Sequence, residues 1–202
     1  GTHPLAGPVA GTAHSVSTMR TAALRGHYRR YYTPDNYVIT VVGNASHRAV
    51  VSSVTRAFGL ADAPVRAPKI SKPPTAPRTR KARVGKAFEQ VNLLRAHSGP
   101  ARGDERRYSM AVLHTILGGG MSSRLFQEVR ERRSLAYSVN AFRASYSDAG
   151  VFGVHAGCAP EKLDQTREVI EAVLREVASA GLSADEVDAA KNQVKGQIVL
   201  DL

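Results

Sequence analysis

Histidine and cysteine side chains are the first candidates for chemistry, because both bind metal ions. The sequence has seven histidines and one cysteine, and His155 and Cys158 lie three positions apart. Positions three apart on a strand point to opposite faces, and a closed zinc site needs four ligands, so we interpret this pair as structural. His114, beside two leucines, and His27, beside a tyrosine and arginines, are interpreted as packed or surface residues.

A second pattern combines three glycines with an arginine and a tyrosine. Residues 117–126 read LGGGMSSRLF, and residues 130–139 read RERRSLAYSV. This pattern resembles the second-half signature of the M16 zinc metallopeptidases, the pitrilysin and mitochondrial-processing-peptidase type, and most resembles their bacterial single-chain branch. Shorter matches occur at residues 3–5 (HPL), 11–12 (GT), 32–36 (YTPDN), 42–43 (VG), 89–90 (EQ) and 182–191 (LSADEVDAAK).

The resemblance implies a catalytic Zn²⁺ in the parent protein. Members of this family carry an H-x-x-E-H motif early in the first domain, whose two histidines bind zinc with a later glutamate while one glutamate acts as general base. None of the seven histidines here has a second histidine and a glutamate at that spacing. We therefore expect no zinc ligand in this chain, and we expect the chain to be inactive alone.

By the same resemblance, Arg130 and Tyr137 match an arginine and a tyrosine that act on the substrate. Tyr137 would donate to the peptide oxygen that becomes negative during hydrolysis, and Arg130 would bind substrate backbone carbonyls through its several N–H groups. From the residues alone an alternative stays open. Arg130 would then be a solvated arginine beside Arg132 and Arg133, and the Tyr137 ring would pack into a sheet.

The three glycines at 118–120 allow two interpretations. Glycine accepts left-handed backbone angles, so the run is typical of a helix stop, and it lacks the lysine of a phosphate loop. The resemblance instead predicts a loop that approaches the substrate closely, with Gly119 and Gly120 in substrate binding.

Alternating and helical periodicities predict the elements that must position these residues. Strands are predicted at 37–42, 84–96, 136–145 and 151–156, the last two as an antiparallel hairpin across the turn residues 147–150. Helices are predicted at 21–32, 46–58, 104–117, 122–133, 160–180 and 183–202. The chain begins in loop residues and stops inside a predicted helix, so we interpret it as an internal fragment.

The net charge of +11 is concentrated in one segment. Residues 66–86 contain eight lysines and arginines, no acidic residue and several prolines, and proline opposes both helix and sheet. A basic extended linker is therefore favoured over a nucleic-acid site, since no aromatic residue for base stacking occurs there. No run of about 18 apolar residues occurs, so no membrane span is predicted, and the single cysteine favours a cytoplasmic location.

These observations predict an α+β architecture of antiparallel sheets packed against helices, LuxS/processing-peptidase-like, with parts of two homologous M16 domains. We predict the end of a catalytic-type first domain at residues 1–60, a linker at 61–81 and the start of the second domain at 82–202. The implied parent function is zinc-dependent cleavage of peptides or unfolded proteins. The alternative is a non-catalytic partner subunit that lends the Arg130–Tyr137 pair to a zinc-bearing subunit, and a homodimer or a heterodimer with an M16 subunit is expected.

Overall fold

The computed structural model describes residues 5, 7–58, 81–85 and 88–201, and the chain divides into two compact units, Gly1–Ser71 and Lys72–Leu202. The assignment of residues 1–60 and 82–202 to two homologous M16 domains stays a prediction. The predicted linker at 61–81 lies almost wholly outside the described residues, so its conformation stays a prediction. Among the described residues, no helix is both long and apolar enough to cross a membrane.

The first unit is helical where the sequence predicts helices. Its elements are α1 (Ala13–Ser17), α2 (Thr21–Tyr31), the 3₁₀ turn η2 (Pro34–Asn36) and α3 (His47–Phe58). Thr12 and Ser15 form a capping box at α1, and the Ser46 hydroxyl accepts from the Ala49 N–H at the start of α3. These caps satisfy backbone N–H groups that have no partner inside a helix.

The predicted strand at 37–42 is wrong, since no strand forms there. Tyr37 has the extended backbone expected of a β-branched run, with φ −93° and ψ 136°. A strand also needs a hydrogen-bonded neighbour, and no other described segment pairs with residues 37–42. Val38 and Val42 are consequently 94% and 93% exposed.

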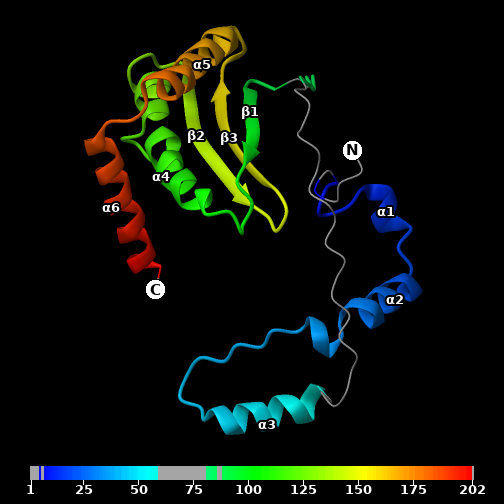
Figure 1. Ribbon diagram of the computed structural model, residues 1–202. Helices are drawn as coiled ribbons and strands as arrows, with labels where there is room; N and C mark the ends of the chain where they lie inside the picture. Colours follow the sequence, from blue (N-terminus) through cyan, green and yellow to red (C-terminus); the bar gives the residue numbers. More distant parts are fainter. Residues whose placement is uncertain (1–4, 6, 59–80, 86–87, 202) are drawn as a thin grey trace. The chain divides into compact units, whose positions relative to one another are not determined.

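The second unit is built on a three-stranded antiparallel sheet in the order β1-β3-β2 (Figure 1). The strands are β1 (Val91–Gly99), β2 (Ala136–Ser145) and β3 (Gly150–Cys158), and the predicted hairpin is confirmed. The first strand begins later than the predicted residue 84. Its pairing starts at Val91, which lies opposite Cys158, the last residue of β3, so no β3 partner remains for earlier residues.

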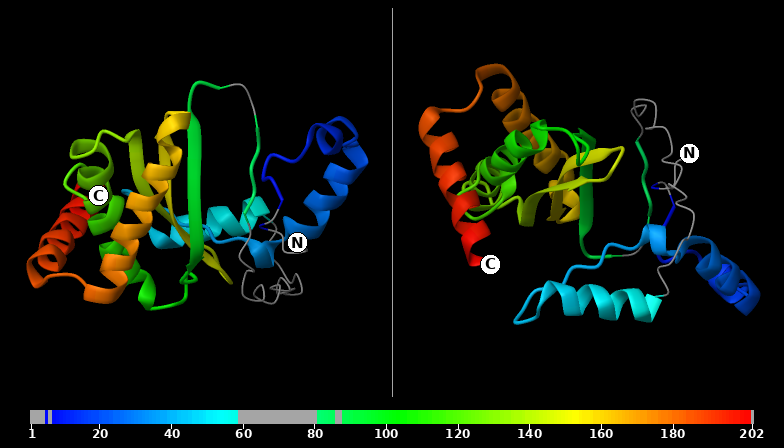
Figure 2. Two further views of the ribbon diagram at one scale, coloured as in Figure 1. Left: turned by 90° about the horizontal axis from the view of Figure 1, so that it is seen from above. Right: turned by 60° about the horizontal axis from the view of Figure 1, so that its bottom comes forward.

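Helices cover one face of this sheet. They are α4 (Arg106–Gly118), the π-helix η3 (Phe126–Glu131), the 3₁₀ turn η4 (Pro160–Lys162), α5 (Leu163–Ala180) and α6 (Ala184–Leu200). In both views of Figure 2, α4 and α5 lie on the same side of the three strands, and α6 packs against α4. The α+β class predicted from the sequence is therefore confirmed.

The core lies between α4, α5 and the sheet. Alternate residues of β3, Phe152, Val154, Ala156 and Cys158, are buried against it. Leu117 of α4 and Ile170 of α5 are both 1% exposed, since the apolar stripes of these helices face the strands. The other face of the sheet carries Asn92, Asn140 and His155, which alternate with core residues along their strands.

Candidate active site

A groove of about 670 Å³ opens at one end of the sheet in the second unit. Four segments meet there: residues 89–90 before β1, the end of η3, the start of β2 and the end of β3. Arg130 and Tyr137 both line it, as do Gln90, Gly157 and Lys162. The groove is thus the place in the described second unit where both predicted substrate residues meet.

Arg130 lies at the end of the π-helix, with its guanidinium above two aromatic rings. Its Cζ is 4.8 Å from the centre of the Phe126 ring and 5.3 Å from the centre of the Tyr137 ring. A guanidinium over aromatic faces is attracted by their negative π-surfaces, and its planar fork is held in one orientation. Arg130 therefore lines the groove with its guanidinium against two aromatic rings.

The wide turn that carries Arg130 is a difference from the ordinary helix predicted at 122–133. Residues 126–131 form i→i+5 hydrogen bonds, and the Arg132 N–H donates to the Gln127 oxygen at 2.9 Å. Leu125 and Val129 are both fully buried, so this turn is anchored in the core on each side of Phe126. Short π-helical turns of this kind occur frequently at functional sites.

The neighbouring arginines are engaged with carboxylates. Arg132 and Arg133 both form ion pairs with Glu128, and these contacts hold the pKa of Glu128 below its usual range, with the hydrogen bond from Arg133 as the main cause. Arg130 makes a much longer contact, 3.9 Å from its Nε to Glu131 Oε1. Arg130 thus differs from the adjacent arginines in carrying its charge at the groove.

Tyr137 is placed by an irregularity in the sheet. Ala136 lies opposite Cys158 and Ser138 lies opposite Gly157, so Tyr137 is the extra residue of a bulge. A bulge re-aims a side chain relative to the regular alternation of a strand. The Tyr137 side chain is 76% exposed beside the groove, so its ring is not packed into the sheet.

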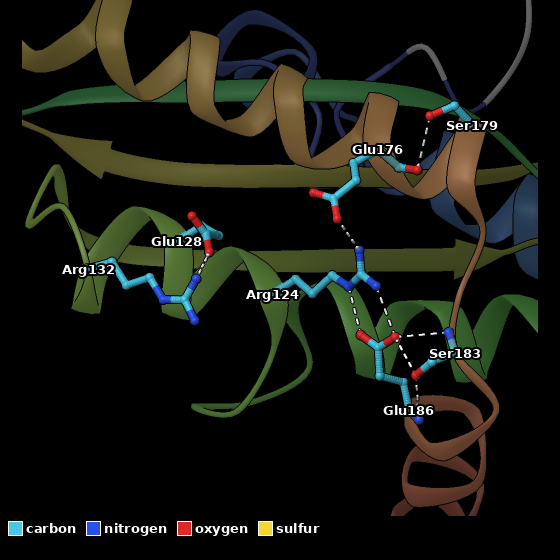
Figure 3. Close-up of polar contacts among 7 residues, drawn as sticks. All are labelled: Arg124, Glu128, Arg132, Glu176, Ser179, Ser183 and Glu186. Atoms are coloured by element: carbon cyan, nitrogen blue, oxygen red, sulfur yellow. Dashed lines mark hydrogen bonds and ion pairs between the residues drawn. The ribbon is translucent and has the colours of Figure 1, made fainter.

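Arg124 ties the segment before η3 to two helices (Figure 3). Its Nε donates to Glu186 Oε1 of α6 at 2.7 Å, and its Nη1 lies 3.3 Å from Glu176 Oε1 of α5. Glu186 also caps α6 through the Ser183 N–H at 3.0 Å. The hydrogen bond from Arg124, helped by that N–H, lowers the pKa of Glu186 to about 2. The sequence shows these three charged residues, but it does not predict that Arg124 contacts both Glu176 and Glu186.

Gly119 and Gly120 follow the end of α4, and neither is among the residues that line this groove. A Cβ on Gly119 would lie 2.7 Å from Thr115 Cα, whereas one on Gly120 would meet only Gln193 at 3.8 Å. Their substrate role stays a prediction. Gly118 has a packing role instead, because a Cβ there would lie 2.2 Å from the backbone nitrogen of Ala141 in β2.

The zinc implied by the resemblance finds no ligand set in the part of the chain that the structure describes. There, no three histidine, cysteine, aspartate or glutamate residues are grouped to hold a metal ion. His155 and Cys158 lie on opposite faces of β3, as predicted, with Cys158 in the core. His114 is half-buried against the Ala141 oxygen, and burial lowers its pKa. The described residues therefore do not fit a zinc site.

Sequence reasoning assigned no role to several groove residues. Gln90 meets Gly157 because β1 pairs with the end of β3, and Lys162 follows that end in η4. Knowledge of the strand register would have predicted these groove residues, but hydrophobic periodicity alone does not give the register.

Comparison with known families decides the assignment of this fold. A family model described as the peptidase M16 inactive domain matches residues 19–194. The chain belongs to the M16 peptidase family. This M16 chain is 40% identical over 211 aligned residues to an uncharacterised zinc protease of Streptomyces coelicolor, of which it covers 45%. It is 38% identical to the uncharacterised zinc protease YmxG of Bacillus subtilis, of which it covers 49%.

Solved structures agree with the family assignment. A peptidase M16 inactive domain from Pseudomonas fluorescens is 29% identical, with a TM-score of 0.89 over 97% of this M16 chain and 48% of that chain. A protease from Helicobacter pylori, at 22% identity and a TM-score of 0.82, shows the same fold. The M16 chain thus spans about half the length of the curated relatives it matches.

Proposed function

We propose that this chain supplies the substrate-holding part of an M16 zinc-dependent endopeptidase that cleaves peptides or unfolded proteins. The observation that carries the proposal is the pairing of Arg130 with Tyr137, 5.3 Å from guanidinium carbon to ring centre, on the wall of a groove of about 670 Å³. The names of the relatives as zinc proteases support the peptidase reading and a Zn²⁺ in the full-length protein.

The two side chains have separate tasks in this proposal. Arg130 is held over the Phe126 and Tyr137 rings, and its N–H groups donate to backbone carbonyl oxygens of an extended peptide. When water adds to the scissile carbonyl carbon, negative charge develops on the carbonyl oxygen, and the Tyr137 hydroxyl donates to that oxygen. Arg130 therefore positions the peptide, and Tyr137 lowers the energy of the transition state.

A second candidate is a non-catalytic subunit that supplies the same pair to a zinc-bearing M16 partner. It is favoured by the matching family model, which describes an inactive domain. In either case we propose a homodimer or a heterodimer with another M16 subunit. We also propose a cytoplasmic location, because the single cysteine, Cys158, is a free thiol in the core.

Hydrolysis of quenched fluorescent peptides by the full-length protein tests the proposal. We expect cleavage that a chelator abolishes and added zinc restores. The subunit alternative predicts that the protein binds peptides but cleaves them only when mixed with a zinc-bearing M16 subunit. A protein that neither binds nor cleaves peptides, alone or with such a subunit, would contradict both candidates.

A further inference from the structure

We propose that the open face of the sheet carries a polar subsite, centred on Gly157, that selects an uncharged hydrogen-bonding side chain of a bound peptide. Its walls are Ser138, Gln90, Asn92, Asn140 and His155. This inference rests on the proposed function, because it adds a residue-selecting pocket to the same peptide groove.

Gly157 lies at the bottom of the subsite. A Cβ on Gly157 would lie 2.8 Å from Ser138 Oγ, 3.8 Å from Gln90 Oε1 and 3.9 Å from Asn92 Oδ1. Three oxygen atoms, one from β2 and two from residues 90–92, therefore surround a position that has no side chain of its own. A side chain at 157 would displace the Ser138 hydroxyl, so glycine is what lets Ser138 lie against β3 here.

His155 extends the polar surface by one step along β3. Its Nε2 lies 3.0 Å from Asn92 Oδ1 of β1, and its Nδ1 lies 3.3 Å from Asn140 Oδ1 of β2. All three residues are on the face opposite the helices, where Asn140 lies directly across from His155 and Asn92 across from Gly157. The network links all three strands yet contributes nothing to the buried core.

The hydrogen-bonding capacity of this network is not used up internally. Each amide oxygen has two lone pairs and each amide nitrogen has two N–H donors, and the contacts of Asn92 and Asn140 with His155 use only part of this capacity. The Asn140 NH₂ already donates to the Ala141 oxygen at 3.3 Å. The cluster thus presents both donors and acceptors on its exposed side, which is the pattern that an amide or a hydroxyl complements.

The same chemistry disfavours other side chains. An aliphatic side chain bound here would leave the amide groups without hydrogen-bond partners, which costs free energy. A charged side chain would lose its contact with water without gaining an opposite charge in the subsite. Ser138, Gln90, Asn92 and Asn140 are uncharged, and both ring nitrogens of His155 already face amide oxygens, so the subsite favours a neutral polar group over aspartate or lysine.

The occupant is a peptide because the subsite is continuous with the Arg130–Tyr137 groove. Gln90 and Gly157 line that groove and also form the edge and floor of the subsite. Residues 155 and 157 of β3 share a face and lie about 7 Å apart, the spacing of alternate residues in an extended chain. A peptide held by Arg130 and Tyr137 therefore lies beside Gly157, which lines the same groove.

Binding of matched peptides to the full-length protein tests this subsite, with a chelator present to prevent cleavage. The probes are fluorescent alanine-rich decapeptides in which one position at a time carries Asn, Asp or Leu, three side chains of similar size. By anisotropy, at one position the Asn peptide should bind about tenfold more tightly than the other two, the effect of roughly one hydrogen bond.

Variants assign that preference to the subsite. Asn92→Ala and Asn140→Ala should abolish the preference, and Gly157→Ala should weaken the Asn peptide more than the Leu peptide. Ser98→Ala is the matched control, because Ser98 lies on the same strand and face as Asn92 but at the far end of the sheet, opposite Val151. Circular dichroism melting identifies any variant whose fold is lost, and Gly157→Ala and the two asparagine variants test the subsite independently.

The outcomes separate this inference from the function on which it rests. If all three peptides bind equally at every position, or if the asparagine variants keep the preference, the subsite is refuted. The proposed function survives that result provided that Arg130→Lys weakens all three peptides. If no peptide binds to the unaltered protein, both the subsite and the proposed function fail.

Discussion

The Arg130 guanidinium carbon lies 5.3 Å from the centre of the Tyr137 ring, although the two residues belong to different elements. Arg130 lies near the end of the π-helical turn η3, and Tyr137 lies in a bulge of β2. Each residue therefore departs from the regular geometry of an α-helix or a β-strand. Two irregularities therefore bring one cation and one phenol to the same groove wall. The predictions below follow from this arrangement and from the contacts that support it.

Arg130→Lys should weaken substrate binding in the full-length protein. Lysine keeps the charge but loses the planar fork that lies over Phe126 and Tyr137. We expect KM to rise about tenfold, since one or two charged hydrogen bonds are lost, with a smaller change in kcat. Arg132→Lys is the control, because the Arg132 side chain is 67% exposed and pairs with Glu128. Equal effects of the two substitutions would contradict the positioning role of Arg130.

Gly118→Ala should destabilise the second unit. The added methyl would lie 2.2 Å from the Ala141 nitrogen, so α4 and β2 must separate, which costs about 1–3 kcal/mol as overpacking does.

Gly196→Ala should have the opposite effect on the free energy of unfolding. Gly196 lies inside α6 with nothing within 4 Å of its Cβ position, so alanine should stabilise the helix by about 0.5–1 kcal/mol. Urea unfolding measures both, and a Gly118→Ala protein as stable as the original would refute this close packing.

Glu186→Gln should lower the stability at neutral pH, and the deficit should disappear in acid. Because the folded-state pKa of Glu186 is lowered to about 2 from 4.5, its carboxylate stabilises the fold above pH 4.5. That contribution is lost as the pH falls from 4.5 toward 2. The glutamine keeps the cap at Ser183 but loses the ion pair with Arg124, so we expect about 1 kcal/mol at pH 7 after solvent screening.

Urea midpoints at pH 7, 4 and 3 measure this effect. The difference between Glu186→Gln and the original protein should shrink at each step. Asp188→Asn is the control on the same helix, since its exposed pair with Lys191 contributes little. A difference that stays constant from pH 7 to pH 3 would show that the charge of Glu186 is not what stabilises the fold.

Local patterns were sufficient to predict most elements of the second unit. The β2–β3 hairpin follows from two apolar strands around a glycine-containing turn, and α6 follows from its Ser183 capping box. The strand at 37–42 failed because periodicity reports the preference of one segment and not the presence of a neighbour to pair with. The start of β1 was misplaced for a related reason, since the end of β3 determines where pairing begins.

The candidate site was only partly predictable. The family resemblance singled out Arg130 and Tyr137, and the structure places both at one groove. The π-turn was not predicted, because the spacing of the buried Leu125 and Val129 is also that of an ordinary α-helix. Gly157, His155 and the two asparagines were not predicted as a cluster either, since only the register of three strands brings them together.

Steady-state kinetics of Tyr137→Phe in the full-length protein test the central claim most directly. The substitution removes one hydroxyl from a side chain that is 76% exposed, so the fold should be unaffected. Loss of an oxyanion donor costs about 3 kcal/mol, so kcat should fall about a hundredfold with little change in KM. Tyr146→Phe, which removes the hydroxyl of another exposed tyrosine near the β2–β3 turn, should leave kcat unchanged. A Tyr137→Phe protein with the original kcat would contradict the account.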